Sequence, residues 1–245
     1  MTELIKAFYL PRAELNSFHE EEMFTLLSRF FDGVTCAQFQ KDLAEKSWVV
    51  LLERDSRLVG FSTLLAYETE FVGEPVSVVY SGDTIVAPEA WHTPALSRAW
   101  IECVRELRAS FPRGKYYWLL LTSGFRTYRF LPLFWREFYP RFDAPPPPPQ
   151  QHLLDFLARQ RFGAQFDSKK GIVRFIQPQR LRDGLNQVPF GKTDDPHVSF
   201  FLQLNPGHVF GDELVCLTEL ADENLTAAGR RIVKQREHEF ACCHC

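Results

Sequence analysis

Apolar side chains recur at helical spacing in the first part of the chain. Ser17 and Glu20 form a capping-box pattern, and from there apolar residues follow every three or four positions until Gly33. Thr35 is placed to cap a second, shorter helix that ends near Lys46. The pattern therefore predicts two consecutive amphipathic helices.

The spacing then changes to the alternation that is typical of strands. β-prone runs occupy residues 48–53, 58–68 and 76–86, and the turn sequences at 55–57 and 73–75 separate them. Short turns between three such runs predict three antiparallel strands joined by hairpins.

A third helix and a buried strand follow. Thr93 is an N-cap candidate, and Pro94 suits the first helical position because its missing N–H costs nothing there. An apolar stripe continues from it to Phe111. Residues 116–121 are apolar almost throughout, which is typical of a central strand that is buried on both faces.

The next segments combine aromatic residues with prolines. Residues 125–138 are predicted to be helical, with a break or kink at Pro132. Five consecutive prolines within residues 144–151 predict an extended, exposed polyproline loop, which serves either as a stiff spacer or as a ligand for a domain of the SH3 type. A helix is predicted over residues 153–161.

Regular patterning weakens toward the C-terminus. Two short strands are expected near residues 164–166 and 172–176. After them come a polar loop, a turn at residues 205–207, a β-prone run at 213–217 and a charged helical tail that follows Asn224.

Composition narrows the class of protein. With 245 residues, of which 45% are hydrophobic and 24% charged, the chain is long enough for one sizeable core and is unlike a disordered chain. A net charge of −3 lacks the basic excess of nucleic-acid-binding proteins, so no nucleic-acid partner is expected. No apolar run approaches about eighteen residues, so no membrane span is expected.

Cysteine and aromatic content add further expectations. Six cysteines are too few for a disulfide scaffold, and the first residues lack a secretory-signal pattern, so a cytoplasmic protein is expected. Residues 242–245 and His238 concentrate soft ligands at one end, but a structural zinc site usually needs two separated ligand pairs, so no metal is expected. The 23 Phe exceed ordinary core need and favour an apolar cleft.

The order of these elements resembles a known fold. Residues 48–62 are similar to its second and third strands, and residues 83–90 to its fourth strand and the exit toward the cofactor. Residues 154–166, with Arg161-Phe162-Gly163, are similar to its last helix and closing corner. On these segments the chain resembles the Gcn5-related N-acetyltransferase (GNAT) fold. The resemblance implies an α/β (α+β) protein with a mixed, mostly antiparallel central sheet flanked by helices.

The resemblance covers roughly residues 5–177. We therefore expect a GNAT-like domain over residues 1–177 and a C-terminal extension of unknown role over residues 178–245. Within that extension, residues 205–208 and 211–213 gather Asn, His, Asp and Glu around turns. These side chains either contribute to a site or only shape the turns.

The resemblance also implies a seat for the cofactor. In the GNAT fold two neighbouring strands splay apart, and the pantetheine arm of acetyl-CoA or another acyl-CoA lies in the opening. The pyrophosphate rests on free N–H groups at the start of the next helix. The matching loop here begins at Trp91, and Pro94 and Leu96 stand at the two positions where the family has glycines. The expected cofactor-binding residues are Ile85, Val86, His92, Thr93, Ala95, Leu96 and Arg98.

Acyl transfer to an amine needs a base, a donor that polarises the carbonyl and an acid for the leaving thiolate. Ser81 and Asp83 are two positions apart on one predicted strand and are expected to share a face. Asp83 is the first candidate for the base, with Glu68 and Glu70 as rivals. The resemblance implies a tyrosine acid beside the leaving sulfur, for which the candidates are Tyr128 and Tyr139.

Two functions fit these observations. The first is an acyltransferase that moves an acyl group from CoA, or from a pantetheine thioester on acyl carrier protein, to an amine or similar small-molecule acceptor. The second is a catalytically inactive GNAT-like module for binding or interaction, because Pro94 and Leu96 replace the glycines of the cofactor loop.

Overall fold

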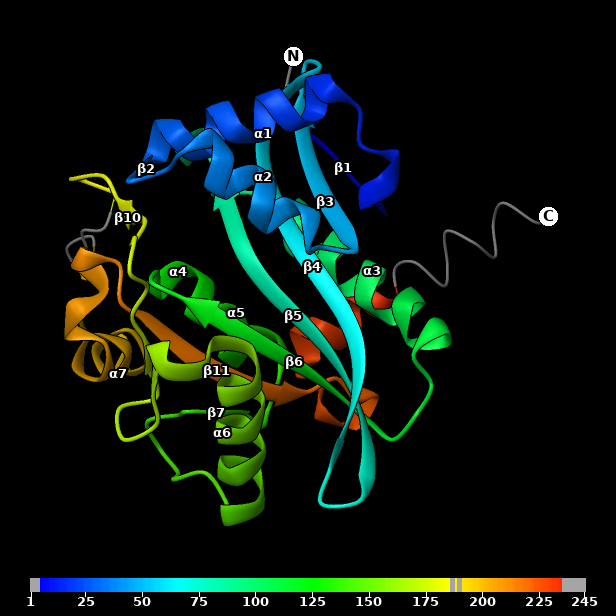
Figure 1. Ribbon diagram of the computed structural model, residues 1–245, viewed down its shortest axis with the longest axis vertical. Coiled ribbons are helices and arrows are strands. Elements are labelled where there is room, and N and C mark those ends of the chain that lie inside the picture. Colours follow the sequence, from blue (N-terminus) through cyan, green and yellow to red (C-terminus); the bar gives the residue numbers. More distant parts are fainter. Residues whose placement is uncertain (1–4, 186–187, 189–190, 235–245) are drawn as a thin grey trace.

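The computed structural model describes residues 5–185, 188 and 191–234, and it builds them around a nine-stranded sheet with a two-stranded sheet beside it (Figure 1). The helices are α1 (Ser17–Phe30), α2 (Cys36–Ala44), α3 (Ala95–Ser110), α4 (Phe125–Tyr128), α5 (Phe130–Phe134), α6 (Pro148–Phe162) and α7 (Pro196–Leu204). The strands are β1 (Ile5–Pro11), β2 (Phe31–Asp32), β3 (Trp48–Arg54), β4 (Arg57–Phe71), β5 (Glu74–Val86), β6 (Lys115–Thr122), β7 (Phe138–Tyr139), β8 (Phe166–Asp167), β9 (Ile172–Val173), β10 (Arg180–Leu181) and β11 (Glu213–Glu219). Short 3₁₀ turns are η1 (Arg12–Glu14), η2 (Pro88–Ala90), η3 (Gly163–Gln165), η4 (Pro206–Phe210) and η5 (Asp222–Asn224), and residues 227–234 are helical.

The central sheet is mixed and mostly antiparallel, which confirms the predicted fold class. Its strand order is β1-β3-β4-β5-β6-β11-β9-β8, with β7 paired to β11. Within this order β5 and β6 run parallel, and the other neighbouring pairs run antiparallel. The turn between β3 and β4 places Asp55 and Ser56 at φ values of 50° and 61°, and such two-residue turns match the twist of the strands that they join.

Strand β11 lies next to β6, although it follows residue 178 in the sequence. Leu214 stands opposite Thr122 and Glu219 opposite Tyr117 in an antiparallel ladder. The other edge of β11 pairs with β7 and β9. The division of the chain into residues 1–177 and 178–245 stays a prediction, but the second part supplies a strand to the sheet of the first.

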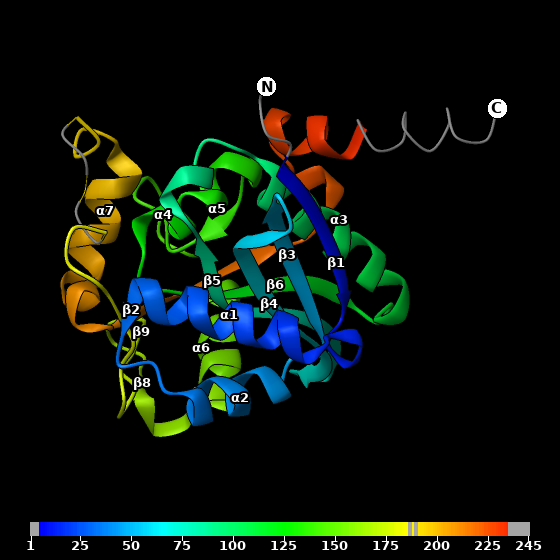
Figure 2. The same ribbon diagram turned by 90° about the horizontal axis from the view of Figure 1, so that it is seen from above.

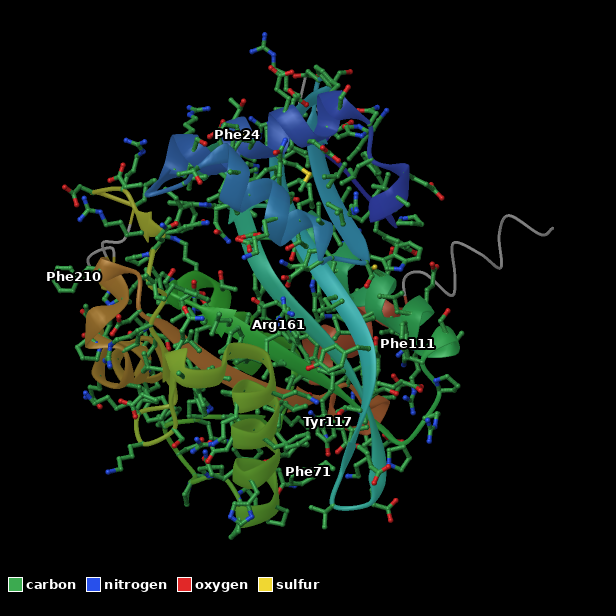
Figure 3. The ribbon with its side chains drawn as sticks, in the orientation of Figure 1. Phe24, Phe71, Phe111, Tyr117, Arg161 and Phe210 are labelled. Atoms are coloured by element: carbon green, nitrogen blue, oxygen red, sulfur yellow. The ribbon has the colours of Figure 1, made fainter. Side chains whose placement is uncertain are left out.

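Helices cover both faces of the sheet. Figure 2 shows α1, α2 and α6 on one face and α3, α4 and α5 on the other. The three tryptophans Trp100, Trp118 and Trp135 pack together, with ring centroids 4.2 Å apart for the first pair and 5.0 Å for the second. On the α6 face Phe71 packs on Phe156 at 5.2 Å (Figure 3). Much of the aromatic content therefore fills the core. None of the described helices is long and apolar enough to cross a membrane.

Several local predictions need correction by a few residues. The N-cap of α1 is Asn16, whose Oδ1 accepts the His19 N–H at 2.8 Å, so Ser17 is already helical. Thr35 caps α2 as predicted. Helix α3 begins at Ala95, one residue after its expected start, and Thr93 Oγ1 accepts the Ala95 N–H at 3.2 Å. Strand β1, which pairs with β3 at the sheet edge, is not among the predicted strands.

The proline-rich segment is only partly extended, contrary to the prediction for residues 144–151. Helix α6 begins at Pro148, so its first turn contains two of the five prolines. The first turn of a helix tolerates proline because its N–H groups have no partner within the helix. The aromatic segment 125–138 is likewise divided into α4, α5 and the short strand β7.

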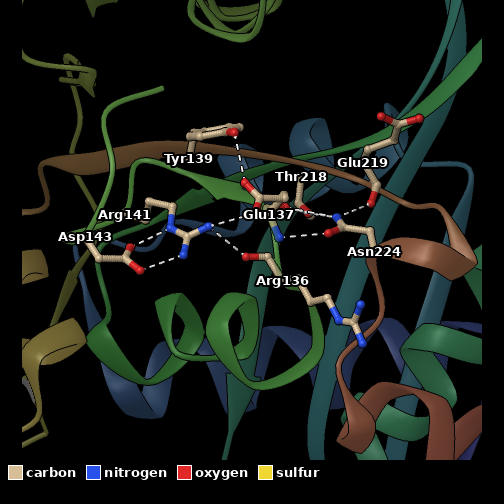
Figure 4. A network of polar contacts seen from close by, with 8 residues as sticks. All are labelled: Arg136, Glu137, Tyr139, Arg141, Asp143, Thr218, Glu219 and Asn224. Carbon is tan, nitrogen blue, oxygen red and sulfur yellow. Dashed lines mark hydrogen bonds and ion pairs between the residues drawn. The ribbon is translucent and has the colours of Figure 1, made fainter. Parts of the chain in front are cut away.

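A polar network around Asn224 joins the end of β11 to the segment between α5 and β7 (Figure 4). The Asn224 amide nitrogen donates to the Glu137 carbonyl, to Thr218 Oγ1 and to the Glu219 carbonyl at 3.0, 3.1 and 2.8 Å. Its Oδ1 accepts the Glu137 N–H at 2.8 Å. One side chain thus satisfies the backbone of two segments that are far apart in the sequence.

We expect Asn224→Ala to lower the free energy of unfolding by about 2 to 3 kcal/mol, because it removes several hydrogen bonds and leaves backbone groups unpaired. Urea unfolding followed by circular dichroism measures this change. Glu223→Ala, at the adjacent exposed position, is the control and should stay within about 0.5 kcal/mol of the parent protein. Equal unfolding midpoints for the two variants would contradict the structural role of Asn224.

Candidate functional site

Strands β5 and β6 separate at their C-terminal ends. Their parallel pairing runs from Val76 opposite Lys115 to Ser81 opposite Leu120, and β5 then continues without β6 to Val86. The separation begins at a bulge in β5.

The bulge lies at Gly82 and Asp83. Ser81 is opposite Leu64 and Thr84 is opposite Ser62, so β5 has one more residue than β4 in this interval. A side chain at Gly82 would place its Cβ 2.9 Å from the Tyr80 hydroxyl, so the Tyr80 side chain would have to shift to admit it. The extra residue bends β5 away from its neighbour.

A cavity of about 1080 Å³ occupies the opening between the two strands. On one face of the sheet it is lined from α2 and α6, and on the other from η2, the start of α3, α4 and α5. Of the predicted site residues, those that line it are Asp83, Ile85, Val86, His92, Thr93 and Leu96. Those that do not are Ala95, Arg98, Tyr128 and Tyr139.

The alternation of backbone groups shows which amides of β5 face the opening. Ala87 N–H donates to the Val59 carbonyl at 2.8 Å, so Ile85, two residues earlier, also directs its N–H and C=O to β4. The N–H groups of Thr84 and Val86 consequently point to the open side. Of the two predicted carbonyl donors, Val86 has its N–H in the opening, whereas that of Ile85 belongs to the β4 ladder.

The carbonyl of Val86 is already occupied. Trp91 folds back from the end of η2, and its indole Nε1 donates to the Val86 carbonyl at 2.7 Å. The guanidinium of Arg126, from α4, lies over the Trp91 ring with its Cζ 3.9 Å from the ring centroid. Arg126 Nη1 also donates to the Leu185 carbonyl at 2.9 Å. These contacts bridge the segments that follow β5 and β6.

The start of α3 offers a seat for an anion at the edge of the cavity. The Ala95 N–H is used by Thr93 Oγ1, and Pro94 has none to give. Among the described residues, the N–H groups of Leu96 and Ser97 have no acceptor. Two free donors at the N-terminus of a 16-residue helix favour a phosphate.

The α6 side of the cavity holds a group of ionisable side chains, here named the charged cluster. It consists of Asp42, Lys46, Tyr80, Asp83, Arg161 and Glu213. Lys46 is 7% exposed, donates from Nζ to the Asp42 carbonyl at 3.1 Å and lies 5.7 Å from the Tyr80 ring centroid. Arg161 covers the same ring at 4.9 Å and pairs with Glu45 (Figure 3).

Burial makes the Asp83 and Glu213 carboxyl groups hard to ionise. It raises the pKa of Asp83, while the nearby Lys46 cation lowers it and the Asp42 carboxylate raises it further. Burial raises the pKa of Glu213 to about 8, and the negative charges of Asp83 and Asp42 act in the same direction. The pKa of Tyr80 is also raised, first by burial and then by Glu213 and Asp83.

The structure separates several residues that were expected to lie together. Ser81 does not share a face with Asp83, because the bulge interrupts the alternation, and its Oγ accepts the Trp118 indole N–H at 2.7 Å in the core. Tyr128 is completely buried and donates to the Pro140 carbonyl at 2.9 Å. Tyr139 donates to Glu137 Oε2 at 3.2 Å and lines a second cavity. Neither tyrosine shares the cavity with Asp83.

The remaining candidates from the sequence are the rival bases Glu68 and Glu70 and the metal-ligand residues near the C-terminal end. Glu68 pairs with Arg113 at 3.8 Å, and neither Glu68 nor Glu70 lines the cavity. The cysteines at 242–245 and His238 lie outside the described residues. Within residues 5–185, 188 and 191–234 no group of three metal-ligating side chains comes together.

Sequence reasoning missed much of the charged cluster. The sequence pattern identifies Lys46 only as a helix end and Tyr80 only as part of a strand. Glu213 had a weak signal in the polar turn before β11, but nothing local indicated that this turn meets Asp83.

Parts of this chain are similar to several solved structures. A conserved protein of unknown function from Enterococcus faecalis is 17% identical over 56% of this chain and 33% of that chain, with a TM-score of 0.42. A GCN5-related N-acetyltransferase from Kribbella flavida is 14% identical over 53% of this chain and 32% of that chain, with a TM-score of 0.40. An acyl-CoA N-acyltransferase from Pseudomonas aeruginosa is 13% identical over 49% and 80%, with a TM-score of 0.38.

This chain thus spans about a third of the length of the first two structures. No family model matches the sequence, and no curated protein matches it. With TM-scores of 0.38 to 0.42, these likenesses carry no argument about this chain. The strand order and the splayed β5 and β6 make the fold of this chain GNAT-like.

The raised pKa of Glu213 predicts that the protein loses stability as pH rises. The folded state keeps a proton on Glu213 up to about pH 8, whereas the unfolded chain releases it near the ordinary value of 4.5. The folded state therefore binds more protons between these values, and the free energy of unfolding decreases across this window. We expect Glu213→Gln to make the decrease shallower.

Urea unfolding at pH 5, 6.5 and 8 measures this slope. Glu219→Gln, at the other end of β11, is the matched control, because Glu219 pairs with Lys115 at the surface. Its slope should equal that of the parent protein. Equal slopes for the parent and Glu213→Gln would show that Glu213 ionises normally.

Proposed function

We propose that this protein is an acyltransferase that moves an acyl group from a pantetheine thioester, carried by CoA, to a small amine. The observation that carries the proposal is the open edge of β5, where the Val86 N–H and the Asp83 side chain face one cavity that is lined from both faces of the sheet.

The side of the cavity formed by the start of α3 and the open edge of β5, here named the donor side, fits a pantetheine thioester in most respects. Such a donor supplies an activated acyl carbonyl and a thiol leaving group. The free N–H groups of Leu96 and Ser97, together with His92, would hold its phosphates, and the Thr84 and Val86 amides would pair with its extended arm. The Val86 carbonyl is not free to pair with this arm, because it already accepts a hydrogen bond from the Trp91 indole N–H.

The acceptor side fits a cationic amine. Asp42, Asp83 and Glu213 bring carboxyl groups to the α6 side of the cavity, and their oxygens can accept hydrogen bonds from an ammonium group. Asp83 is proposed to take the ammonium proton, directly or through water, while the Val86 N–H polarises the acyl carbonyl. Tyr128 and Tyr139 are left without a part in this proposal, because neither lines the cavity.

Titration calorimetry with CoA and acetyl-CoA tests the donor, and release of free thiol from acetyl-CoA in the presence of diamines or amino sugars tests the transfer. Saturable one-to-one binding with amine-dependent thiol release supports the proposal. Binding of neither donor would overturn CoA as the carrier. The same assay with an acetylated acyl carrier protein then separates a protein-borne donor from a GNAT-like module without turnover.

We expect Asp83→Asn to reduce kcat by about 10² to 10⁴-fold, because a neutral amide cannot accept the ammonium proton. The Kd for CoA should not change, since Asp83 lies on the acceptor side. Glu68→Gln, on the exposed part of β4, is the control and should keep the parent turnover. Undiminished turnover in Asp83→Asn would remove its role as base.

We expect Trp91→Phe to bind CoA about 3 to 10-fold more tightly. The change keeps an aromatic ring but frees the Val86 carbonyl for one additional hydrogen bond from the bound arm. Calorimetry measures the change in Kd, and Trp48→Phe, in β3 and outside the cavity, serves as control. Weaker binding by Trp91→Phe would show instead that the indole N–H holds the ligand.

A further inference from the structure

Glu213 stands where three strands of the sheet end. Because β5 and β6 are parallel, their C-terminal residues meet at one end of the sheet. Because β11 is antiparallel to β6, its first residue lies at that same end, one position beyond the pairing of Leu214 with Thr122. The topology thus brings Glu213 to the opening between β5 and β6.

Side-chain alternation also directs Glu213 to the same face as Asp83. Val215 and Leu217 pack with the α6 side of the core, so Glu213, two residues before Val215, faces that side too. Tyr80 faces it from β5, and the bulge that follows lets Asp83 face it as well. Glu213 and Asp83 both line the cavity and influence each other electrostatically.

The backbone beside Glu213 is held firmly. The buried Asn205 donates from Nδ2 to the Asp212 carbonyl at 2.8 Å, and Arg174 Nε donates to Asp212 Oδ2 at 2.8 Å. In contrast, no hydrogen bond or ion pair joins the Glu213 carboxyl group to another side chain in the described part of the chain. A carboxyl group that is held in place without a partner costs stability and is available to a ligand.

We propose that Glu213 is a second catalytic carboxyl group, which titrates as a unit with Asp83 and contacts the acceptor ammonium together with it. This inference rests on the proposed function. The ammonium gives one proton to the pair, and its nitrogen lone pair then forms the C–N bond. The C–S bond of the thioester breaks, the leaving thiolate takes the proton from the pair, and the new amide nitrogen releases its second proton to water, so that the pair returns to its starting state.

The surroundings of the pair favour a coupled titration of its two carboxyl groups. The ionisable side chains around it are Asp42 and Lys46 from the end of α2, Tyr80 from β5 and Arg161 from α6. Two half-buried carboxyl groups that line one cavity and influence each other do not both ionise readily, so they titrate as a unit in two steps. The raised pKa values of Asp83 and Glu213 agree with this behaviour.

The first test measures the pair in the unliganded full-length protein, without any acyl transfer. Carbon-13 NMR of labelled Glu side-chain carboxyl groups, assigned with Glu213→Gln, follows the titration of Glu213. We expect its midpoint near pH 8, and a lower midpoint in Asp83→Asn because a neighbouring negative charge is gone. An ordinary midpoint near 4.5 that Asp83→Asn leaves unchanged would overturn the pair.

The second test measures the part that Glu213 takes in the reaction. We expect Glu213→Gln to lower kcat about 100-fold and to remove a fall in rate near pH 8, because the site then has no second carboxyl proton to lose. Glu213→Asp should recover part of the rate, and Glu219→Gln should behave as the parent protein.

The two tests separate the possible failures. A shared titration together with a parent-like rate and profile in Glu213→Gln would overturn the catalytic role of Glu213. If the parent protein transfers no acyl group from acetyl-CoA, the proposed function fails, while the NMR titration still decides whether Glu213 and Asp83 form a pair.

Discussion

The candidate site depends on one backbone irregularity, the bulge of β5 at Gly82 and Asp83. It ends the pairing with β6, so the Thr84 and Val86 amides lose their strand partner and face a cavity. It also reverses the alternation, so that Ser81 stays in the core while Asp83 reaches the opening. An unbroken ladder would bury the same amides in hydrogen bonds and close the cavity.

The opening has a different chemistry on each face of the sheet. On the α3 side it offers backbone N–H groups at a helix start, and on the α6 side it offers carboxyl groups. A donor that carries phosphates and an acceptor that carries a positive charge would thus approach from opposite sides and meet at β5. Trp91 lies at this meeting point, since its indole holds the Val86 carbonyl and its ring stacks on Arg126.

The charged cluster costs stability, and the fold supports it from several directions. Buried carboxyl groups are unfavourable unless they are neutralised or protonated. Lys46 eases the ionisation of Asp83, and Asn205 and Arg174 fix the strand that presents Glu213. The part of the chain beyond residue 178 therefore contributes to the core of the sheet and to the cavity, in addition to any separate role.

Local patterns in the sequence determined the helices α1 to α3, the hairpin strands β3 to β5, the buried strand β6 and the placement of Asp83 near a strand end. Hydrophobic period, turn residues and caps act over a few residues, so they are readable without a structure. Only the tertiary structure decided the register of β4 and β5, the insertion of β11 beside β6, the contact of Trp91 with Val86 and the meeting of Asp83 with Glu213. These features depend on how segments that are distant in the chain pair and pack, and no short-range pattern encodes such contacts.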